Sequence, residues 1–355
     1  MTEKMRAAVY EAPEKIVVHD LPVPNCGSHD VLVRVRACGV CGSDVHTYKK
    51  GMYVQPGQVV GHEFIGEAVV VGDQIEGIAV GDRVTGFTMG FCGKCFWCQR
   101  GQYGLCPEIF ANSMGYGRPG AFADYVLIER AVLGASVHRV PDSVPVTAAA
   151  TVEPVSVAVG TVTMAEVQPG DSVVVLGGGL IGNACLQVAK ASGAGKVVLV
   201  EVSPSRLAAA EAAGADAVFD ARTGDPLEWV KQEIGVGRYH FGEGGMADVV
   251  IEAAGAPQTI VQSFEMVRSG GTIAFVGLPE NPAPIDTTKI VHKAPRIVGC
   301  LGGDFGRSIE LLATEQVKTE PLVTHTFDLD DVDEAFRTQL RADDVMKVVV
   351  TMDAS

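Results

Sequence analysis

A glycine-rich turn near the middle of the chain limits the folds that this sequence can adopt. The six residues from Gly177 read GGGLIG, in which Gly177, Gly179 and Gly182 form the pattern G-x-G-x-x-G. A continuous apolar run, Ser172–Leu176, precedes the turn, and a helical pattern from 180 to 191 follows it. A buried strand that enters a helix through such a turn is typical of a parallel α/β sheet. Alone, the glycines could also form an ordinary tight turn.

The second strand of this unit supports a nucleotide-binding interpretation. The apolar run Val197–Val200 leads to Glu201, which lies 19 residues after Gly182. In a dinucleotide-binding unit the glycines admit a pyrophosphate, the helix N-terminus binds it, and the acid takes the ribose hydroxyls. A carboxylate there would repel a 2′-phosphate, which favours NAD over NADP. Arg206 could lie against the adenine, pair with Glu201 or attract a phosphate. The predicted coenzyme-binding residues are Gly177, Gly179, Leu180, Ile181, Gly182, Glu201 and Arg206.

The two parts of the chain differ in pattern. After about residue 153, short apolar strands alternate with helices, which predicts a doubly wound α/β domain. Before it, short runs rich in branched residues are separated by Gly, Pro, Asn and Asp, which predicts a strongly turned β-domain. The expected β-strands of the first part are Arg6–Val9, Val31–Ala37, Phe64–Val71 and Arg83–Phe87. Those of the second part continue with Val218–Asp220, Asp248–Glu252 and Ile273–Val276, and Met346–Thr351 is expected as a final strand.

Composition narrows the class of partners. The 355 residues are 47% hydrophobic and carry a formal net charge of −15. Such an acidic surface repels phosphate backbones and anionic lipids, so we expect no nucleic acid partner. The charged N-terminus lacks the core of a signal peptide, and no apolar run is long enough to span a membrane. We expect a cytoplasmic protein that works in a reducing compartment.

Four of the nine cysteines are clustered in one short segment. The segment contains Cys92, Cys95, Cys98 and Cys106 within fifteen positions. Four thiolates at this spacing suit tetrahedral zinc, and a closed shell of four sulfurs leaves no position for a substrate. The sequence therefore predicts a structural zinc site. Disulfides and an iron–sulfur cluster are the alternatives, which a reducing compartment and a coenzyme domain disfavour.

A second group of metal-binding residue types lies upstream. Cys41 is followed by Ser43 and His46, and the tripeptide Gly-His-Glu supplies His62 and Glu63. Cysteine, histidine and a carboxylate can hold one zinc and leave a fourth position open for an alcohol oxygen. Each residue alone could equally be a structural one. Their occurrence together with a dinucleotide turn favours a catalytic metal site.

Taken in order, these motifs resemble one enzyme superfamily. The segments CGVCGSDVH, GHE, CGKCFWCQRGQYGLC, TVEP at Thr151–Pro154 and GGGLIG are similar to the zinc-containing medium-chain alcohol dehydrogenases. Glu153-Pro154 resembles the polyol (sorbitol), threonine and butanediol dehydrogenase branch, and the segment from Arg118 to Tyr125 is similar to threonine dehydrogenase. The resemblance covers essentially the whole chain. The residues that surround the substrate in sorbitol dehydrogenases are not cleanly matched at Thr47–Lys50, so the substrate stays open.

The resemblance implies a domain organisation and roles for single residues. It implies a GroES-like β-rich catalytic domain at 1–154 and 295–355, a Rossmann NAD-binding domain at 155–294, and a homotetramer or homodimer. It implies that Cys41 and His62 bind the catalytic zinc with Glu63 or Glu153, of which Glu153 is slightly preferred. It assigns a proton relay to Ser43, the coenzyme ribose and His46. The nicotinamide end is expected at Val276, Gly277, Cys300 and Leu301, and Asp44 and Lys347 are expected to support the metal site.

The expected function is hydride transfer between NAD and a small-molecule alcohol. Two zinc ions per chain, one catalytic and one structural, would serve a secondary alcohol dehydrogenase for a polyol, sugar, vicinal diol or hydroxy amino acid. A biosynthetic ketoreductase, acting for example on an aminocyclitol, is the alternative within the same superfamily. A non-catalytic protein that binds NAD and zinc is the alternative of another class.

Overall fold

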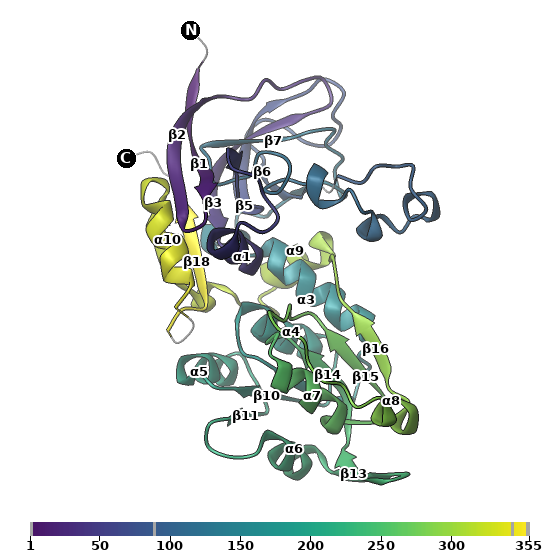
Figure 1. The fold of residues 1–355 in the computed structure, drawn as a ribbon. Helices are drawn as coiled ribbons and strands as arrows, with labels where there is room; N and C mark the ends of the chain where they lie inside the picture. The colour runs from purple at the N-terminus through teal and green to yellow at the C-terminus, as the bar shows by residue number, and fades with distance from the viewer. Residues whose placement is uncertain (1–2, 88–89, 342–343, 353–355) are drawn as a thin grey trace. The chain divides into compact units, whose positions relative to one another are not determined.

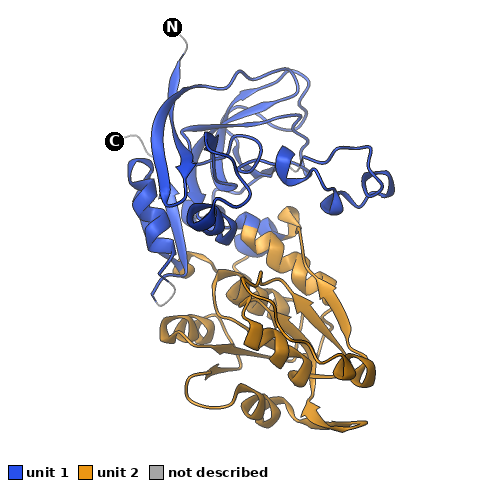
Figure 2. Cartoon of the chain, viewed as in Figure 1, with its two compact units in different colours: residues 1–153, 308–313, 323–355 blue, residues 154–307, 314–322 orange. Residues whose placement is uncertain are grey.

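The computed structural model describes residues 3–87, 90–341 and 344–352, which form two compact units (Figures 1 and 2). Unit 1 comprises residues 1–153, 308–313 and 323–355, and unit 2 comprises residues 154–307 and 314–322. Each unit has its own sheets and its own buried core.

Unit 1 is built mainly from antiparallel strands. A seven-stranded sheet has the order β17-β18-β3-β5-β6-β8 with β7 paired to β3, and a smaller sheet has the order β2-β1-β4. The strands are β1 (Lys4–Ala12), β2 (Lys15–Pro22), β3 (Val31–Gly39), β4 (Gln58–Val59), β5 (Glu63–Val71), β6 (Arg83–Gly86), β7 (Tyr125–Ile128), β8 (Val137–Arg139), β17 (Val323–Asp328) and β18 (Lys347–Thr351). Valine and isoleucine dominate the buried positions of these strands, as branched side chains fit a pleated surface.

The helices of unit 1 are short and lie between the strands. They are α1 (Gly42–Lys50), α2 (Val146–Ala149), α10 (Val332–Gln339), and the 3-10 turns η1 (Cys98–Arg100), η2 (Tyr103–Leu105), η3 (Phe110–Asn112) and η5 (Leu329–Asp331). Helix α9 (Phe305–Ala313) begins in unit 2 and ends in unit 1. The core of unit 1 joins side chains from both ends of the chain, among them Tyr48, Phe122 and Phe336.

Unit 2 contains a six-stranded parallel sheet. Its order is β11-β10-β9-β14-β15-β16, and every neighbouring pair is parallel. The strands are β9 (Ser172–Leu176), β10 (Lys196–Glu201), β11 (Ala217–Asp220), β14 (Ala247–Glu252), β15 (Val267–Phe275) and β16 (Arg296–Gly299). The consecutive side chains of 173–176 in β9 are all fully buried, so both faces of the sheet are covered.

The remaining elements of unit 2 are the crossover helices and one hairpin (Figure 1). Helix α3 (Val152–Met164) begins in unit 1 with its first two residues and continues in unit 2. The other helices are α4 (Leu180–Ala191), α5 (Pro204–Ala212), α6 (Pro226–Ile234), α7 (Pro257–Met266), α8 (Thr287–Lys293) and the 3-10 turn η4 (Glu320–Leu322), and the hairpin pairs β12 (Val236–Tyr239) with β13 (Gly242–Gly245). The chain order of the sheet reverses between β9 and β14. In parallel sheets of this kind, ligands bind at the carboxyl ends of the two strands between which the order reverses.

The division into units differs from the boundary expected at residue 295. Strand β16 pairs in parallel with β15, with Arg296 opposite Thr272, so it completes the sheet of unit 2. Residues up to 307, and again 314–322, therefore belong to unit 2. Most side chains of β16 are exposed, so its sequence lacks the continuous apolar run that marks the inner strands.

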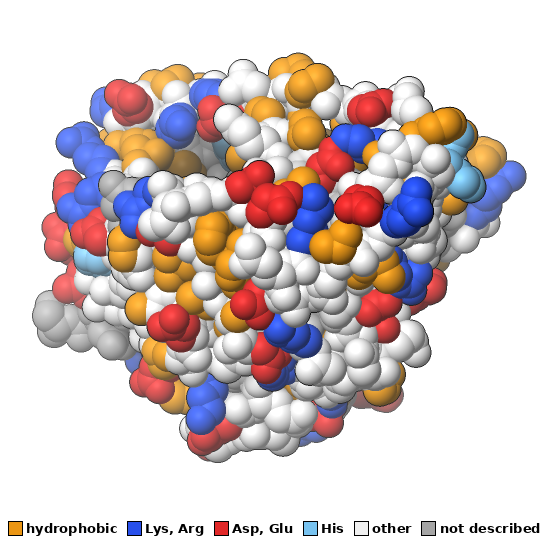
Figure 3. Space-filling view, turned by 90° about the horizontal axis from the view of Figure 1, so that it is seen from below, with side chains coloured by type: hydrophobic (Ala, Val, Ile, Leu, Met, Phe, Trp, Pro, Cys, Tyr) orange, Lys and Arg blue, Asp and Glu red, His pale blue; other side chains and the backbone are white. Residues whose placement is uncertain are grey.

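Charged side chains of both signs are distributed over the surface. On the face drawn in Figure 3, Asp and Glu are interspersed with Lys and Arg, and hydrophobic side chains lie between them. The chain carries 43 acidic and 28 basic residues, so its net negative charge comes from an excess of acidic over basic side chains.

Candidate active site

Cys41 lies in the turn between β3 and α1 and is the N-cap residue of that helix. The carboxylate of Asp44, in the first turn, accepts a hydrogen bond of 3.0 Å from the Cys41 backbone N–H. This bond belongs to a capping box, which fixes the start of the helix and the backbone that carries the thiol. Burial raises the pKa of the Cys41 thiol, and the negative charge of Glu63 raises it further.

The register of two neighbouring strands places the other two ligand types beside Cys41. Antiparallel pairing sets Glu63, the first residue of β5, opposite Gly39 at the end of β3. A Cβ atom at Gly39 would lie 2.4 Å from Glu63 Oε2, so the glycine makes room for the carboxylate. The ligand atoms of Cys41, His62 and Glu63 all lie within 4.8 Å of one another. His62 and Glu63 are only 2% and 1% exposed.

The environment of His62 is negatively charged. Burial by itself lowers the pKa of His62, but the charges of Asp44 and Cys41 outweigh burial and raise it well above its usual value. Asp44 Oδ1 lies 3.9 Å from His62 Nδ1, beyond hydrogen-bond distance. Within the described part of the chain, no group hydrogen-bonds His62 Nδ1. A buried imidazole nitrogen that has no hydrogen-bond partner and lies near negative charges is suited to bind a metal cation.

Lys347 contacts the same group from β18. Its buried ammonium donates one hydrogen bond to the Glu63 carboxylate and another, of 2.8 Å, to the Val40 carbonyl oxygen. The negative charge of Glu63 helps to raise the pKa of Lys347, although burial opposes this. The lysine therefore holds one oxygen of Glu63 in place.

Glu153 lies in the first turn of α3 and remains a candidate ligand. Although part of the residue is accessible, loss of hydration raises the pKa of its carboxyl group to about 7, and the charge of Glu63 adds to this rise. His62 lowers the pKa, so Glu153 acts on the imidazole electrostatically. The set of ligand atoms within 4.8 Å contains Glu63 and not Glu153.

The two predicted relay residues lie one turn apart on α1. Ser43 and His46 are spaced three residues apart, which places them on the same side of the helix. The Ser43 hydroxyl forms a hydrogen bond of 3.0 Å with the hydroxyl of Tyr116. Both Ser43 and His46 lie in the unit that contains Cys41 and His62.

The residues present fit a zinc ion at this site. Thiolate, imidazole and carboxylate are all zinc ligands, and three protein ligands are the usual number in a catalytic site. Glu63 places a buried carboxylate beside the half-buried Cys41 thiol and the His62 imidazole, and a dication would offset that negative charge. The same donor set with Glu153 in place of Glu63 would fit the same chemistry.

The four clustered cysteines form a second metal-binding group. Cys92, Cys95, Cys98 and Cys106 have sulfur atoms that all lie within 4.8 Å of one another. Sulfur separations of 3.5 Å (Cys95–Cys98) and 4.0 Å (Cys92–Cys98) are close to the edge of about 3.8 Å in a tetrahedron with zinc–sulfur bonds of about 2.3 Å. All four are free thiols. The geometry fits a closed structural zinc site.

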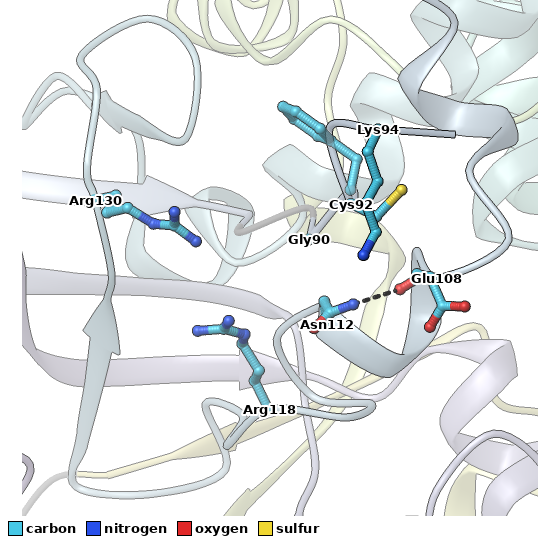
Figure 4. Close-up of a pocket in the computed structure, with 8 residues that line it drawn as sticks. Gly90, Cys92, Lys94, Glu108, Asn112, Arg118 and Arg130 are labelled. Carbon is cyan, nitrogen blue, oxygen red and sulfur yellow. Dashed lines mark hydrogen bonds between the residues drawn. The ribbon is translucent and has the colours of Figure 1, made fainter. Parts of the chain in front are cut away.

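A polar cavity of about 370 Å³ lies beside this cysteine loop (Figure 4). Lys94, Arg118 and Arg130 line it together with Glu108, and Asn112 donates a hydrogen bond of 3.0 Å to the Glu108 carbonyl oxygen. The cavity borders Cys92. Its lining includes none of the residues of the Cys41–His62–Glu63 group.

The glycine-rich turn connects β9 to α4 as predicted from the sequence. Gly177 has a φ of +98°, and a Cβ there would lie 2.8 Å from the Ala254 nitrogen, so both space and backbone require glycine. A Cβ at Gly182 would lie 1.8 Å from the Gly177 oxygen, which allows the helix to begin against the strand. At Gly179, the N-cap of α4, an added Cβ would have no described atom within 4 Å, which leaves room for a ligand beside Leu180 and Ile181.

Glu201 ends β10 and contacts the turn directly. Its Oε2 accepts a hydrogen bond of 2.7 Å from the Gly178 N–H, and its Oε1 accepts one of 2.6 Å from the Val202 N–H. Arg206 Nη1 lies 3.7 Å from Glu201 Oε2. The acid is therefore placed at the turn where a ribose is expected, with Arg206 beside it.

The residues expected at the nicotinamide end follow two adjacent strands. Val276 and Gly277 come directly after β15, and Cys300 and Leu301 come directly after β16. The Cys300 N–H donates a hydrogen bond of 2.9 Å to the Phe275 carbonyl oxygen, which joins the two strand ends. These four residues thus share the carboxyl edge of the sheet.

Tyr116 is a site residue that the sequence analysis did not identify. Its ring stacks on His62 with a centroid distance of 5.0 Å and an interplanar angle of 28°. Burial raises the pKa of the phenol above its usual range, and the charge of Cys41 adds to this rise. No sequence spacing relates Tyr116 to His62, since the contact depends on how one loop folds onto another.

Comparison with known proteins gives the family. Residues 27–142 match the family model of the alcohol dehydrogenase GroES-like domain, and residues 181–316 match that of the zinc-binding dehydrogenases. A sorbitol dehydrogenase from Bacillus subtilis (strain 168) is 33% identical over 98% of this chain and 97% of its own length. This chain belongs to the zinc-containing medium-chain dehydrogenases. It is an oxidoreductase, and the family and fold class predicted from the sequence are confirmed.

Other relatives agree with this membership. An L-threonine 3-dehydrogenase from Rhizobium rhizogenes (strain K84) is 35% identical over 99% of both chains. The crystal structure of a zinc-binding dehydrogenase from Sinorhizobium meliloti 1021 bound to NADP has a TM-score of 0.88 and 31% identity, and covers 99% of this chain and 100% of that one. Relatives named sorbitol and L-threonine 3-dehydrogenase thus match this dehydrogenase over nearly their whole length. Among its described residues, no helix has the length and apolar character that crossing a membrane requires.

Proposed function

We propose that this dehydrogenase transfers hydride between NAD and a secondary alcohol, which is a polyol, sugar, vicinal diol or hydroxy amino acid, and the corresponding ketone. The observation that carries the proposal is the group of half-buried Cys41 and buried His62 and Glu63, whose ligand atoms lie within 4.8 Å of one another. A zinc ion bound by such a group supplies a Lewis acid that lowers the pKa of an alcohol hydroxyl.

The protein groups have distinct tasks in this proposal. Cys41 and His62 bind the metal with Glu63 or Glu153, and Lys347 orients Glu63 through its hydrogen bond. Ser43 accepts the proton of the alcohol while it gives up its own hydroxyl proton, which the coenzyme ribose and then His46 would pass to solvent. An imidazole suits this last step because it can both accept and release a proton. Cys92, Cys95, Cys98 and Cys106 bind the second, structural zinc.

The coenzyme is held by unit 2. The turn from Gly177 to Gly182 and the start of α4 bind the pyrophosphate, and Glu201 binds the ribose hydroxyls. The position of the Glu201 carboxylate, which accepts the Gly178 N–H, supports NAD rather than NADP because it would repel a 2′-phosphate. Val276, Gly277, Cys300 and Leu301 surround the nicotinamide in this proposal. A homotetramer or homodimer in the cytoplasm is the expected assembly and location, and nine free cysteines suit a reducing compartment.

The test is a substrate panel with metal analysis. Purified enzyme with two zinc ions per chain is assayed with NAD⁺ and a series of alcohols, polyols, diols and hydroxy amino acids by the absorbance of NADH. We expect turnover of at least one secondary alcohol, its loss in Cys41→Ser with one zinc per chain remaining, and its retention in Cys26→Ser. Absence of turnover with two bound zinc ions, or a single zinc confined to the cysteine loop, would contradict the proposal.

A further inference from the structure

Tyr116 is fixed beside the candidate metal site by a loop that packs on the chain just before His62. Gly115 has a φ of +76°, and a Cβ there would lie 2.5 Å from the Gly61 carbonyl oxygen. The Ala121 N–H donates a hydrogen bond of 2.9 Å to the same oxygen. The two segments thus approach as closely as their backbones allow, and Tyr116 has little freedom to move away from His62.

One side chain therefore contacts two functional groups. The Tyr116 hydroxyl lies 3.0 Å from Ser43 Oγ, and its ring stacks on the His62 imidazole. Ser43 comes from α1 and His62 directly precedes β5, so Tyr116 connects the two segments that carry the site. The hydroxyl and the ring can be tested separately, because phenylalanine retains only the ring.

The surrounding rings protect this contact from water. Phe110 packs edge-on against Tyr116 at 5.2 Å, and Tyr53 does so at 6.2 Å. Tyr116 is 9% exposed, whereas Tyr53 and Phe110 are 38% and 42% exposed. The Ser43–Tyr116 hydrogen bond is thus partly shielded, and shielded bonds restrain a hydroxyl more than solvated ones do.

The hydrogen bond limits what the Ser43 hydroxyl can do. A serine hydroxyl has one proton and two lone pairs, and it rotates to suit its partners. In the bond with Tyr116, one of these positions is occupied and the rotation of the Ser43 hydroxyl is restricted. The positions that remain are then held in a more constant direction. A proton acceptor that is already oriented needs no reorganisation when the proton moves.

We propose that Tyr116 is a positioning residue that orients the Ser43 hydroxyl for proton transfer and, through its ring, holds the His62 imidazole. The inference rests on the proposed alcohol oxidation, in which Ser43 accepts the substrate proton while it passes its own hydroxyl proton along the relay. Tyr116 itself transfers no proton in this scheme. Its hydroxyl affects kcat because it orients Ser43, whereas its ring restrains the imidazole of the metal ligand His62.

The test compares Tyr116→Phe with Tyr53→Phe. The second variant removes a phenol from the same aromatic cluster and leaves the Ser43–Tyr116 bond intact. We expect Tyr116→Phe to lower kcat about tenfold at neutral pH, with KM within about threefold and two zinc ions retained, and to shift the rise of kcat to higher pH. Tyr53→Phe should keep the wild-type kcat and pH profile.

A double variant separates positioning from general structural support. In a Ser43→Ala background, adding Tyr116→Phe should change kcat by less than about twofold, because the hydroxyl it orients is already absent. An unchanged kcat and pH profile in Tyr116→Phe, loss of the zinc in that variant, or fully additive losses in the double variant would overturn the inference. Failure of the wild-type enzyme to oxidise any alcohol would instead overturn the proposed function.

Discussion

The ammonium group of Lys347, in the last strand, donates a hydrogen bond to the carboxylate of Glu63 at the start of β5, 284 residues earlier in the chain. Both side chains are buried, at 3% and 1% exposure. The C-terminal strand thus places a positive charge beside the candidate metal ligands. The pair connects the N-terminal and C-terminal segments of unit 1 and fixes one of the two carboxylates that could bind zinc.

Substitution of Lys347 with Met should destabilise the protein. It leaves the Glu63 carboxylate buried without its cation, and breaking a buried pair in this way costs about 3 kcal/mol or more. The measurement is the free energy of unfolding of unit 1 in urea, monitored with a spectroscopic probe in that unit. Lys15→Met is the matched control: Lys15 pairs with Glu11 at 2.7 Å but is 60% exposed, so its loss should cost less than about 1 kcal/mol. Equal losses in the two variants would contradict the structural role of Lys347.

The cysteine loop gives a prediction about metal content. Cys98 is 6% exposed, and its sulfur lies 3.5 Å from that of Cys95. Cys98→Ser should reduce bound zinc from two ions to one per chain and lower the thermal midpoint by about 5 °C or more, because a closed zinc site contributes directly to folding. Cys26→Ser, which changes a cysteine outside both groups, should keep both ions. Two ions retained in Cys98→Ser would contradict the assignment of Cys98 as a zinc ligand.

Local patterns in the sequence predicted the parts of the site whose residues are close in the chain. The four cysteines lie within fifteen positions, so their spacing alone brings the sulfurs together, as the structure shows. The glycine-rich turn is equally local, since steric limits at Gly177 and Gly182 act on their immediate neighbours. These features need little knowledge of the tertiary fold.

Contacts between distant segments could not be predicted in this way. Tyr116 reaches Ser43 across 73 residues because a glycine at 115 lets one loop pack on another. The resemblance to related enzymes indicated both Glu63 and Glu153 as ligands, but only strand register reveals that Glu63 lies in the compact group. The boundary expected at residue 295 differs from the observed one, which lies beyond β16, because the exposed edge strand β16 has no apolar run to mark it.

Glu201 gives a prediction about coenzyme choice. In the structure, the Gly178 N–H donates a hydrogen bond of 2.7 Å to Glu201. Glu201→Gln removes the negative charge but keeps an oxygen that can accept this bond. Without repulsion of a 2′-phosphate, the ratio of kcat/KM for NAD⁺ to that for NADP⁺ should fall by about tenfold or more. Glu211→Gln, an exposed acid on α5, serves as the charge-matched control and should leave the ratio unchanged. A wild-type ratio below one would contradict the preference for NAD.

Lys293 gives a prediction about stability at alkaline pH, far from either group of metal ligands in the sequence. Its side chain is 2% exposed and donates hydrogen bonds of 2.7 Å and 3.1 Å to the carbonyl oxygens of Phe264 and Glu265. Burial lowers the pKa of Lys293 from 10.5 to about 8, and the charge of Lys289 adds to this effect. Between pH 8 and 10.5 the unfolded chain therefore binds more protons at this residue than the folded chain does, so stability rises with pH in that window.

The measurement is the difference in unfolding free energy between the wild type and Lys293→Met at pH 7.0 and pH 9.5. A neutral amine can still donate to the Phe264 oxygen, so the wild type should gain about 2 kcal/mol relative to the variant over this interval. Comparison with Lys318→Met, which changes a lysine of unit 2 that is 61% exposed, removes the general effect of alkaline pH. Lys318 should show no such gain, because its side chain is exposed to solvent in the folded chain. A difference between wild type and Lys293→Met that stays constant from pH 7.0 to 9.5 would mean that Lys293 titrates as an exposed lysine does.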